Sequence, residues 1–398
     1  MFLARTFLSH SEQSLIKSLE NIKLTPSSTT LIALHAPAPK LQPLFDQISK
    51  FPSKNIGCLS APISSKHLIS LSLFNIPSSI EHRVWRSTIP GTERAQVGRW
   101  YSREQIKRER SEGSMESSPD WNSDTARPPA LPHALQGFVD AKRQISGLLF
   151  FTDDAPQGLA TSLNHYFPKT AKIGSIASST PFITGRPFTI FESGSIYSDG
   201  AVGVAIAGTK ALGIHPNFSS LRPIGIPLLT TSAASNIIYT MNNLPAADIL
   251  AQLLGSRVNA NVEDRPTIYL GVLDAQGKIT RTFSVLAGSP SRGALLLDGE
   301  HSPTVGSKVQ FLISAHDTLD HFDITTPPMT QEGSAIDAHF ACLSPMDANS
   351  SSSMTPSNDE TIIYSRFLVA SENGFMMDRG EGLWECKIPF VGASMRLR

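Results

Sequence analysis

The sequence lacks most of the features that mark the common protein classes. Its 398 residues include only three cysteines, Cys58, Cys342 and Cys386, whose wide spacing excludes a disulfide framework and a Cys-x-x-Cys zinc site. It has no run of about 18 apolar residues, so we expect no membrane-spanning helix and no membrane partner. Sparse cysteines are typical of reduced thiols, and we therefore expect an intracellular protein of the cytoplasm or nucleus.

An excess of charge of one sign is also absent. The chain has 34 basic and 34 acidic residues, and a formal net charge of zero argues against a nucleic-acid partner, which usually requires a basic face. Hydrophobic residues make up 40% and charged residues 17%, so the chain has enough apolar material to fold. Its length suits two domains, or two halves that share an interface.

The common enzyme motifs are missing as well. No Gly-x-Ser-x-Gly elbow, phosphate loop, dinucleotide fingerprint or His-Glu-x-x-His occurs, so we assign no enzymatic activity and expect no cofactor. The most metal-like cluster, between His316 and Asp323, is interpreted as the solvated start of a helix capped by Ser314, and no metal site is predicted. An undescribed hydrolase remains an alternative, although no base adjoins the serines discussed below.

The most informative stretch runs from Lys172 to Gly208, KIGSIASSTPFITGRPFTIFESGSIYSDGAVGVAIAG. Asp199-Gly200 lies between two strand-like runs and predicts a hairpin, because both residue types tolerate the positive φ of a type I′ turn. In the second run the alternate residues on one face are all small, which predicts that another layer approaches closely. These small residues are Ala201, Gly203, Ala205 and Ala207.

The order of IGSIASSTPF, a Gly-Arg-Pro turn, a hairpin and GAVGVAIAG resembles the central part of the FIST domain, found in bacterial sensory proteins and some eukaryotic F-box proteins. Residues Ile226 to Leu250 resemble the joint between that family's N- and C-terminal halves, and Phe367 to Phe375 resembles its ending. The resemblance implies an N-terminal half over residues 1–215 and a C-terminal half over 216–398. It implies an α+β fold with mixed or antiparallel sheets covered by helices.

Local patterns predict several elements. Strands are expected at Thr29–His35, Asn55–Ala61, His67–Ile76 and Gln144–Thr152, and a helix at Leu41–Ile48. Apolar residues at helical spacing predict a helix within Met1–Leu24, capped by Ser9 or Ser11; a mitochondrial presequence is the alternative. Asp154 is expected to cap a helix over Pro156–Phe167. Polar composition predicts a flexible insertion at about 94–132 and a flexible loop at about 344–359.

The resemblance implies a sensory module that recognises a small polar ligand, with amino acids as the candidate class. The candidate binding residues are Gly174, Ser175, Ser178, Ser179, Arg186, Glu372 and Asn373. Arg186 offers a planar fork to a ligand carboxylate and Glu372 a carboxylate to its amino group, which would place the site between the two halves. The alternatives are a solvated arginine and an Asn373-Gly374 hairpin turn.

A second reading of the same resemblance is a protein-recognition scaffold related to the substrate-binding part of F-box ubiquitin ligases. The chain has no recognisable F-box of its own. The helix-like string NLPAADILAQLL begins with Leu-Pro like such a module, but strand-like sequence soon follows it. A scaffold of this kind would therefore need a separate adaptor.

Overall fold

The computed structural model describes residues 2–64, 67–89, 129–208, 211–255, 267–289, 293–299, 301–314, 336–343, 361–380 and 382–398. The predicted insertion lies outside the described residues except for its last four, 129–132. The predicted loop at 344–359 and the cluster from His316 to Asp323 lie wholly outside them.

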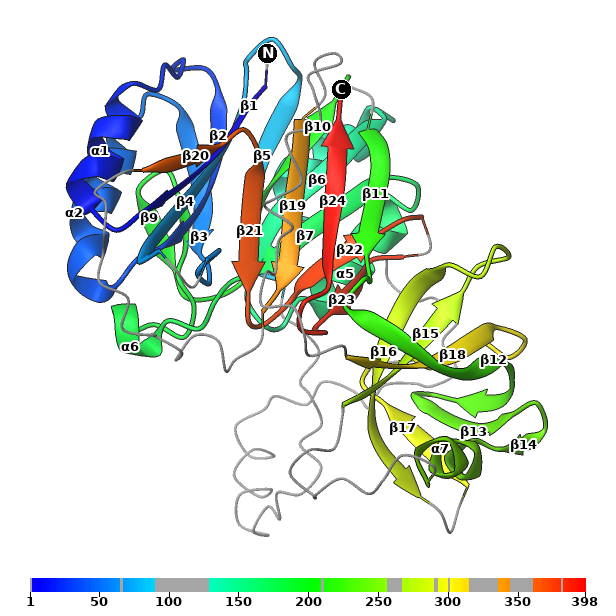
Figure 1. Ribbon diagram of the computed structural model, residues 1–398. Coiled ribbons are helices and arrows are strands. Elements are labelled where there is room, and N and C mark those ends of the chain that lie inside the picture. The colour runs from blue at the N-terminus through cyan, green and yellow to red at the C-terminus, as the bar shows by residue number, and fades with distance from the viewer. Residues whose placement is uncertain are drawn as a thin grey trace, which may run out of the picture.

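The described residues are mostly β, so the prediction of an α+β fold with sheets covered by helices is wrong. Their strands form four sheets of seven, six, four and seven strands, accompanied by six helices (Figure 1). Three of the sheets cover one another and the fourth closes on itself. Because one face of each sheet is already buried by another sheet or by closure, few helices are required.

The first sheet has the order β20-β1-β4-β2-β3-β8-β9. Its strands are β1 (Leu3–Ser9), β2 (Thr29–His35), β3 (Lys54–Leu59), β4 (Ile69–Ile76), β8 (Ile190–Glu192), β9 (Ser195–Tyr197) and β20 (Ile362–Tyr364). Helices α1 (Glu12–Glu20) and α2 (Ala38–Ser49) cover one of its faces. The predicted elements at β2, α2, β3 and β4 are confirmed, whereas β1 is not predicted from the sequence. Ser11 caps α1 as expected, because its side chain accepts a hydrogen bond from the Ser14 amide.

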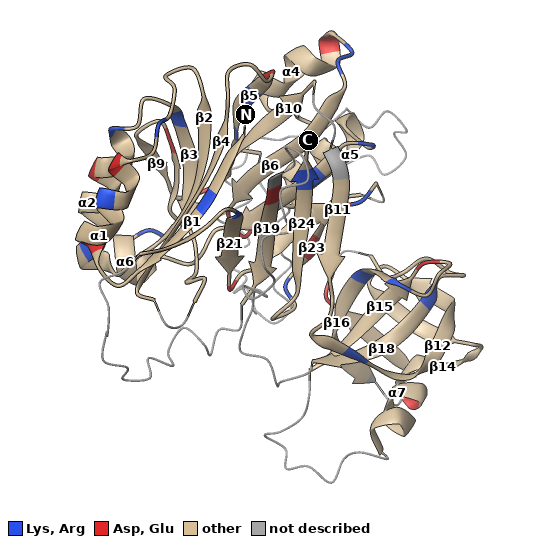
Figure 2. Ribbon diagram, turned by 45° about the horizontal axis from the view of Figure 1, so that its top comes forward, with Lys and Arg blue, Asp and Glu red and all other residues tan. Residues whose placement is uncertain are grey.

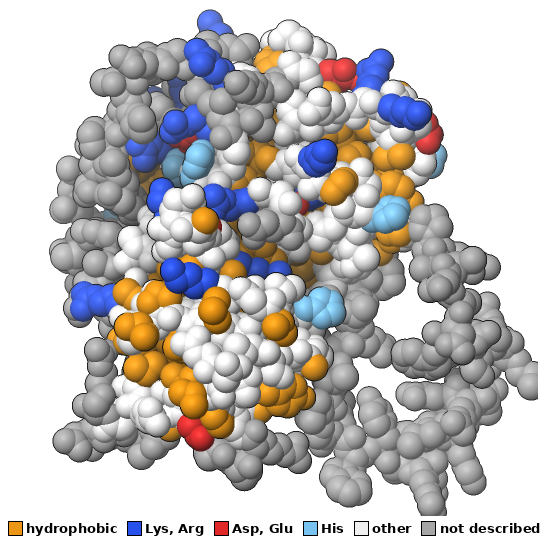
Figure 3. All heavy atoms as spheres, turned by 90° about the vertical axis from the view of Figure 1, so that its right-hand side faces the viewer, with side chains coloured by type: hydrophobic (Ala, Val, Ile, Leu, Met, Phe, Trp, Pro, Cys, Tyr) orange, Lys and Arg blue, Asp and Glu red, His pale blue; other side chains and the backbone are white. Residues whose placement is uncertain are grey.

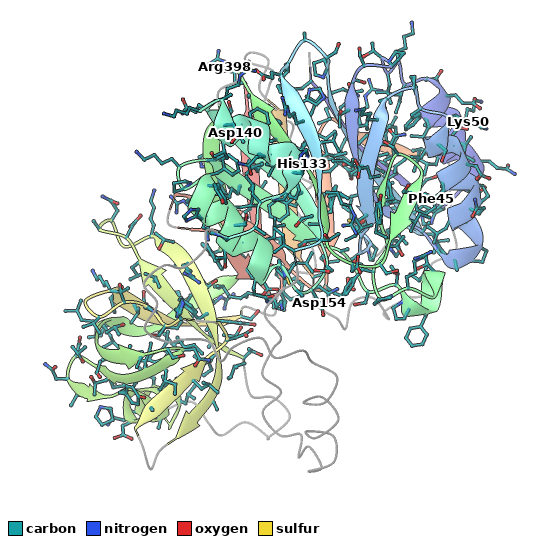
Figure 4. All side chains as sticks on the ribbon, turned by 180° about the vertical axis from the view of Figure 1, so that it is seen from behind. Phe45, Lys50, His133, Asp140, Asp154 and Arg398 are labelled. Carbon is teal, nitrogen blue, oxygen red and sulfur yellow. The ribbon has the colours of Figure 1, made fainter. Side chains whose placement is uncertain are left out.

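The second sheet has the order β23-β22-β7-β6-β10-β5, and the third β11-β24-β19-β21. The strands of the second are β5 (His82–Ser87), β6 (Ile145–Thr152), β7 (Ala171–Ile176), β10 (Ala201–Ala207), β22 (Phe375–Asp378) and β23 (Trp384–Cys386). Those of the third are β11 (Ala211–Asn217), β19 (Ile336–Cys342), β21 (Phe367–Ser371) and β24 (Gly392–Leu397). Helices α4 (His133–Asp140) and α5 (Gln157–Tyr166) pack on the second sheet (Figure 4).

One continuous core joins these three sheets, which together are called the body. Its side chains come from the first sheet (Leu31, Ile56), the second (Leu149, Ile173, Val202) and the third (Phe340, Phe367, Met395). Strand β11 pairs with β24 at the end of the chain. Most of β11 lies before the predicted boundary at residue 215. The division of the chain into two domains at residue 215 stays a prediction.

The hairpin predicted at Asp199-Gly200 is wrong. Strand β10 pairs with β5 and β6 and not with β9, whereas β8 and β9 form a hairpin around Ser193-Gly194. Ser193 and Gly194 have φ values of 46° and 89°, as a type I′ turn requires. Asp199-Gly200 instead carries the chain from the first sheet to the second.

The small-residue face of β10 does lie under bulky side chains. A Cβ atom on Gly203 would lie 2.7 Å from Phe150 Cβ and would clash with the Trp85 ring. Trp85 and Phe150 come from β5 and β6, the two strands that flank β10. The approach that the pattern predicts is therefore made by aromatic rings of neighbouring strands.

Residues 221–314 form the fourth sheet. Its order is β12-β18-β15-β16-β17-β13-β14, and an additional β12–β13 pairing closes six of the strands into a barrel. The strands are β12 (Leu221–Ala234), β13 (Ile237–Met241), β14 (Leu244–Pro245), β15 (Ile268–Leu273), β16 (Ile279–Ser289), β17 (Ala294–Leu297) and β18 (Lys308–Ser314), with helix α7 (Ala246–Gly255) beside them. This unit, called the barrel, has an apolar interior.

Charged residues of both signs are scattered over the described ribbon in Figure 2. No helix of the described residues is long and apolar enough to cross a membrane.

Candidate functional site

Three pairs of parallel strands, one in each sheet of the body, end at the same place. The pairs are β2–β3, β6–β7 and β19–β21. In Figure 1 the arrowheads of β19 and β21 point to the lower end of the body. Ligands of sheets that contain parallel strands commonly bind outside the carboxyl ends of those strands, so this end is the candidate site.

Backbone hydrogen bonds fasten these strand ends to one another across the sheets. The Ser178 amide donates to Leu59 O at 3.1 Å, and the Ala61 amide donates to Ala370 O at 2.9 Å. The Ile176 amide donates to Gly374 O at 3.1 Å. Residues 59–61, 176–179, 342–343 and 371–374 therefore form one region, here called the converging edge.

Glu372 is the centre of the polar side chains at the converging edge. Its Oε2 accepts a hydrogen bond from Ser178 Oγ, and its Oε1 accepts one from the Ser179 amide, both at 2.7 Å. Asn373 Nδ2 donates to Ala177 O at 2.9 Å and to Ser179 Oγ at 3.2 Å. The structure thus brings together four of the predicted site residues from segments 194 residues apart in the chain.

The segment that carries Glu372 and Asn373 is not a hairpin turn. It links β21 in the third sheet to β22 in the second, and these two strands do not pair with each other. Gly374 has a φ of 95°, and a side chain there would clash with Cys386 O, so this turn requires glycine. The crossing between sheets explains how Glu372 reaches Ser178.

The Glu372 carboxylate also affects buried thiols near the edge. Burial first, and then the negative charge of Glu372, raises the pKa of the Cys58 thiol. Burial also raises the pKa of Cys342, with Cys386 and Glu372 adding to the effect. Both thiols are therefore protonated at neutral pH, and neither is an activated nucleophile.

The other predicted site residues lie elsewhere. Gly174 lies under the Phe150 ring inside the second sheet. Ser175 is buried, and its hydroxyl donates to Ile176 O at 3.2 Å. Arg186 Nη1 donates to Ser198 Oγ at 3.0 Å, and no hydrogen bond or ion pair in the described part of the chain joins it to Glu372.

Ser60 is a site residue that sequence reasoning misses. It follows β3 at the converging edge and is only 4% exposed, and its hydroxyl has no hydrogen-bond partner among the described residues. Its carbonyl lies 3.3 Å from His35 Nδ1, and burial lowers the pKa of His35. The one signal in the sequence is a polar residue directly after a buried strand, which is too common to single out Ser60.

Asp153 and Asp154 follow β6 beside the edge, where Figure 4 labels Asp154. The prediction that Asp154 caps α5 is wrong, because the cap residue is Pro156 and no side chain bonds there. Asp153 instead accepts hydrogen bonds from the Ala155 and Gly200 amides, at 3.1 and 2.6 Å. Burial raises the pKa of Asp153.

The side chains described at the edge supply hydrogen-bond donors and acceptors. Within the described ranges, no group of three or more His, Cys, Asp or Glu residues is placed to hold a metal ion. The Ser178 hydroxyl donates to Glu372, and the Ser179 hydroxyl accepts from Asn373. In the hydrogen bonds described above, neither hydroxyl is bonded to a histidine. A serine–histidine contact, Ser64 Oγ to His67 Nδ1 at 3.2 Å, joins residues three apart in a turn.

A comparison with models of known protein families matches part of the chain. The family model of the FIST N domain matches residues 32–244, which is more than half of the chain and includes Ser178 and Ser179. No curated protein matches the chain. The match ends at residue 244 and does not reach Glu372, so the predicted C-terminal family half and the predicted link to F-box proteins remain predictions.

Proposed function

Since the chain belongs to the FIST N domain family of signalling sensory domains, we propose that it binds a small polar ligand at the converging edge. The observation that carries the proposal is the meeting of three parallel strand pairs at Glu372, Ser178, Ser179 and Asn373. The carboxyl ends of parallel strands, together with a few convergent polar groups, are a common setting of a small-molecule site.

Amino acids are the ligand class we test first, because Glu372 offers a carboxylate to an ammonium group. Arg186 remains the candidate partner of the ligand carboxylate. It would have to give up its bond to Ser198, which is an exposed contact. The exposed position makes this exchange inexpensive.

The experiment is a thermal-shift screen of amino acids and other metabolites on the purified protein, because a ligand that binds only the native state raises its melting temperature. A hit is then titrated calorimetrically into the parent and into Ser178→Ala, Asn373→Ala and Arg186→Ala. Loss of a hydrogen bond to a charged group should weaken binding by about tenfold to a hundredfold. Ser195→Ala, on the exposed strand β9, is the control. Unchanged affinity in all three variants would move the site away from the converging edge.

A second candidate function, recognition of a protein partner, is favoured by the outer surface of the barrel. Exposed aliphatic side chains lie on or beside β12 and β14, where Ile226 is 73%, Val305 61% and Leu244 58% exposed. Figure 3 faces the barrel and shows hydrophobic side chains across its surface. Exposed apolar patches of this kind mark protein interaction sites.

The scaffold is tested with an Ile226→Ser, Leu244→Ser variant. If the barrel binds a protein partner, cross-linking mass spectrometry should detect fewer cross-links to that partner in this variant than in the parent protein. They should persist in Leu68→Ser, which alters an aliphatic side chain on the body that is 51% exposed. Equal cross-linking of both variants would count against a barrel interface.

A further inference from the structure

We infer that the group recognised at the converging edge is a protonated amine, held by the Glu372 carboxylate together with the hydroxyl of Ser60. This inference rests on the proposed function and narrows it, because it names the charge of the ligand and adds a binding residue. Three observations carry it: the charge of the edge, the burial of Ser60, and the match of donors and acceptors.

The charge of the edge is negative. Glu372 is the only residue within 59–61, 176–179, 342–343 and 371–374 whose side chain is charged at neutral pH. The neighbouring cation Lys387 is paired with Glu385 at 2.7 Å, and Arg186 is directed to Ser198. Burial keeps His35 neutral by lowering its pKa. A ligand carboxylate placed here would meet a like charge, whereas an ammonium would meet its opposite.

From its backbone contacts we infer that the Ser60 hydroxyl lies on the side of Glu372. The residues on either side of it are fastened to the two segments that form the Glu372–Ser178 contact, since Leu59 O accepts from Ser178 and the Ala61 amide donates to Ala370. Successive side chains of an extended segment alternate, so Ser60 faces the same way as Cys58. Cys58 is the thiol whose pKa the Glu372 charge raises.

The buried hydroxyl of Ser60 has no hydrogen-bond partner among the described residues. A buried polar group without a hydrogen bond costs on the order of 1–3 kcal/mol, so a ligand donor that reaches Ser60 Oγ recovers this energy. Glu372 retains acceptor capacity at Oε2, because that oxygen has two lone pairs and accepts one described bond, from Ser178, whereas Oε1 accepts from the Ser179 amide and, at 3.4 Å, from Asn373 Nδ2. An ammonium group has three donors and no acceptor, and it suits a site that presents these oxygens.

The test uses three forms of each proteinogenic amino acid with an uncharged side chain: the free zwitterion, the amide, which is only cationic, and the N-acetyl form, which is only anionic. Thermal shift should detect binding of the zwitterion and the amide of the same side chain, and none of its N-acetyl form. For the best amide, Glu372→Gln should weaken calorimetric binding by about a hundredfold and Ser60→Ala by about tenfold. Glu372→Gln preserves side-chain shape and one acceptor oxygen.

The matched control is Ser162→Ala, which deletes another buried hydroxyl without a described partner, on helix α5. It should leave amide binding unchanged. Binding of N-acetyl forms in preference to amides would overturn the inference and leave the proposed function standing. Amide binding that neither Ser60→Ala nor Glu372→Gln weakens would also overturn it, as would the absence of binding by every cationic probe. The proposed function fails if no metabolite of any charge binds, or if binding is unchanged in Ser178→Ala, Asn373→Ala and Arg186→Ala.

Discussion

The body and the barrel bury their sheets in different ways. In the body, three open sheets pack on a common core, and helices cover only part of the outer faces. In the barrel, six strands close around an apolar interior with one described helix beside them. Closure satisfies the edge strands and buries one face without a second layer, whereas stacking leaves strand ends from several sheets side by side.

This difference explains why the candidate site lies in the body. The described strand pairs of the barrel are all antiparallel, so their carboxyl ends alternate between its two ends. Each sheet of the body contains a parallel pair, and the three pairs point the same way. Polar groups that follow these strands are therefore collected at one edge.

The largest effect is expected at a buried ion pair in the body, between Lys172 on β7 and Asp378 on β22. Both side chains are 0% exposed, and Asp378 also accepts hydrogen bonds from the Gly380 and Gly382 amides. Lys172→Met leaves the Asp378 charge buried and unpaired, which should lower the free energy of unfolding by about 3–5 kcal/mol in chemical denaturation. Arg143→Met breaks an ion pair with Glu81 whose side chains are 57% and 45% exposed, and should cost no more than about 1 kcal/mol. Equal costs would show that burial of the pair is not decisive.

Acid should destabilise the body through His339 on β19. Burial lowers the pKa of His339 to about 4 from an ordinary 6.5, with Arg366 and Arg396 adding to the effect and Asp337 opposing it. The unfolded chain therefore binds this proton first as the pH falls. The stability is fully present above pH 6.5 and is lost toward pH 4, by at most about 3 kcal/mol.

Denaturation curves between pH 7 and 4 test this behaviour. His339→Gln should flatten the decline in the free energy of unfolding, and His165→Gln, at an exposed position on α5, should decline like the parent. A parallel decline of His339→Gln and the parent would exclude His339 as the source.

Two glycines compare how the body and the barrel tolerate added volume. Gly203→Ala should destabilise the protein by about 1–3 kcal/mol, because the added methyl meets Phe150 Cβ and the Trp85 ring. Gly271→Ala in the barrel should cost less, since its methyl meets the end of the flexible Leu312 side chain at 2.8 Å. Thermal and chemical denaturation of both variants would measure the difference. A larger cost at Gly271 would mean that the closed barrel is the more rigid unit.

The smallest effect concerns the contact between the two regions. The Arg281 guanidinium of β16 lies 5.7 Å from the ring centroid of Trp384 on β23. A double-mutant cycle of Arg281→Met and Trp384→Leu should give a coupling energy of about 0.5–1 kcal/mol. A coupling energy of zero would show that this stacking does not join the barrel to the body energetically.

Local sequence patterns predict single elements of the body well. The runs at β2, β3, β4 and β6 are apolar and bounded by turn residues, and the helix at α2 has apolar residues on one side, so burial of each element is encoded within about ten residues of chain. Pairing is less predictable. Ser193-Gly194 and Asp199-Gly200 are both dipeptides that tolerate positive φ. Which of them forms a hairpin turn depends on the sheets in which β9 and β10 pair.

The sequence by itself determined the family motifs between Lys172 and Gly208, the small face of β10, and the polar character of Ser178, Ser179, Glu372 and Asn373. Only the tertiary structure decided that sheets cover one another and that the barrel closes. It also decided that Ser178 meets Glu372, 194 residues away, and that the Ser60 hydroxyl is buried without a partner among the described residues. Periodicity and turn chemistry act between neighbours in the chain and leave a local signature. The meeting of strand ends from three sheets depends on long-range packing, which leaves none.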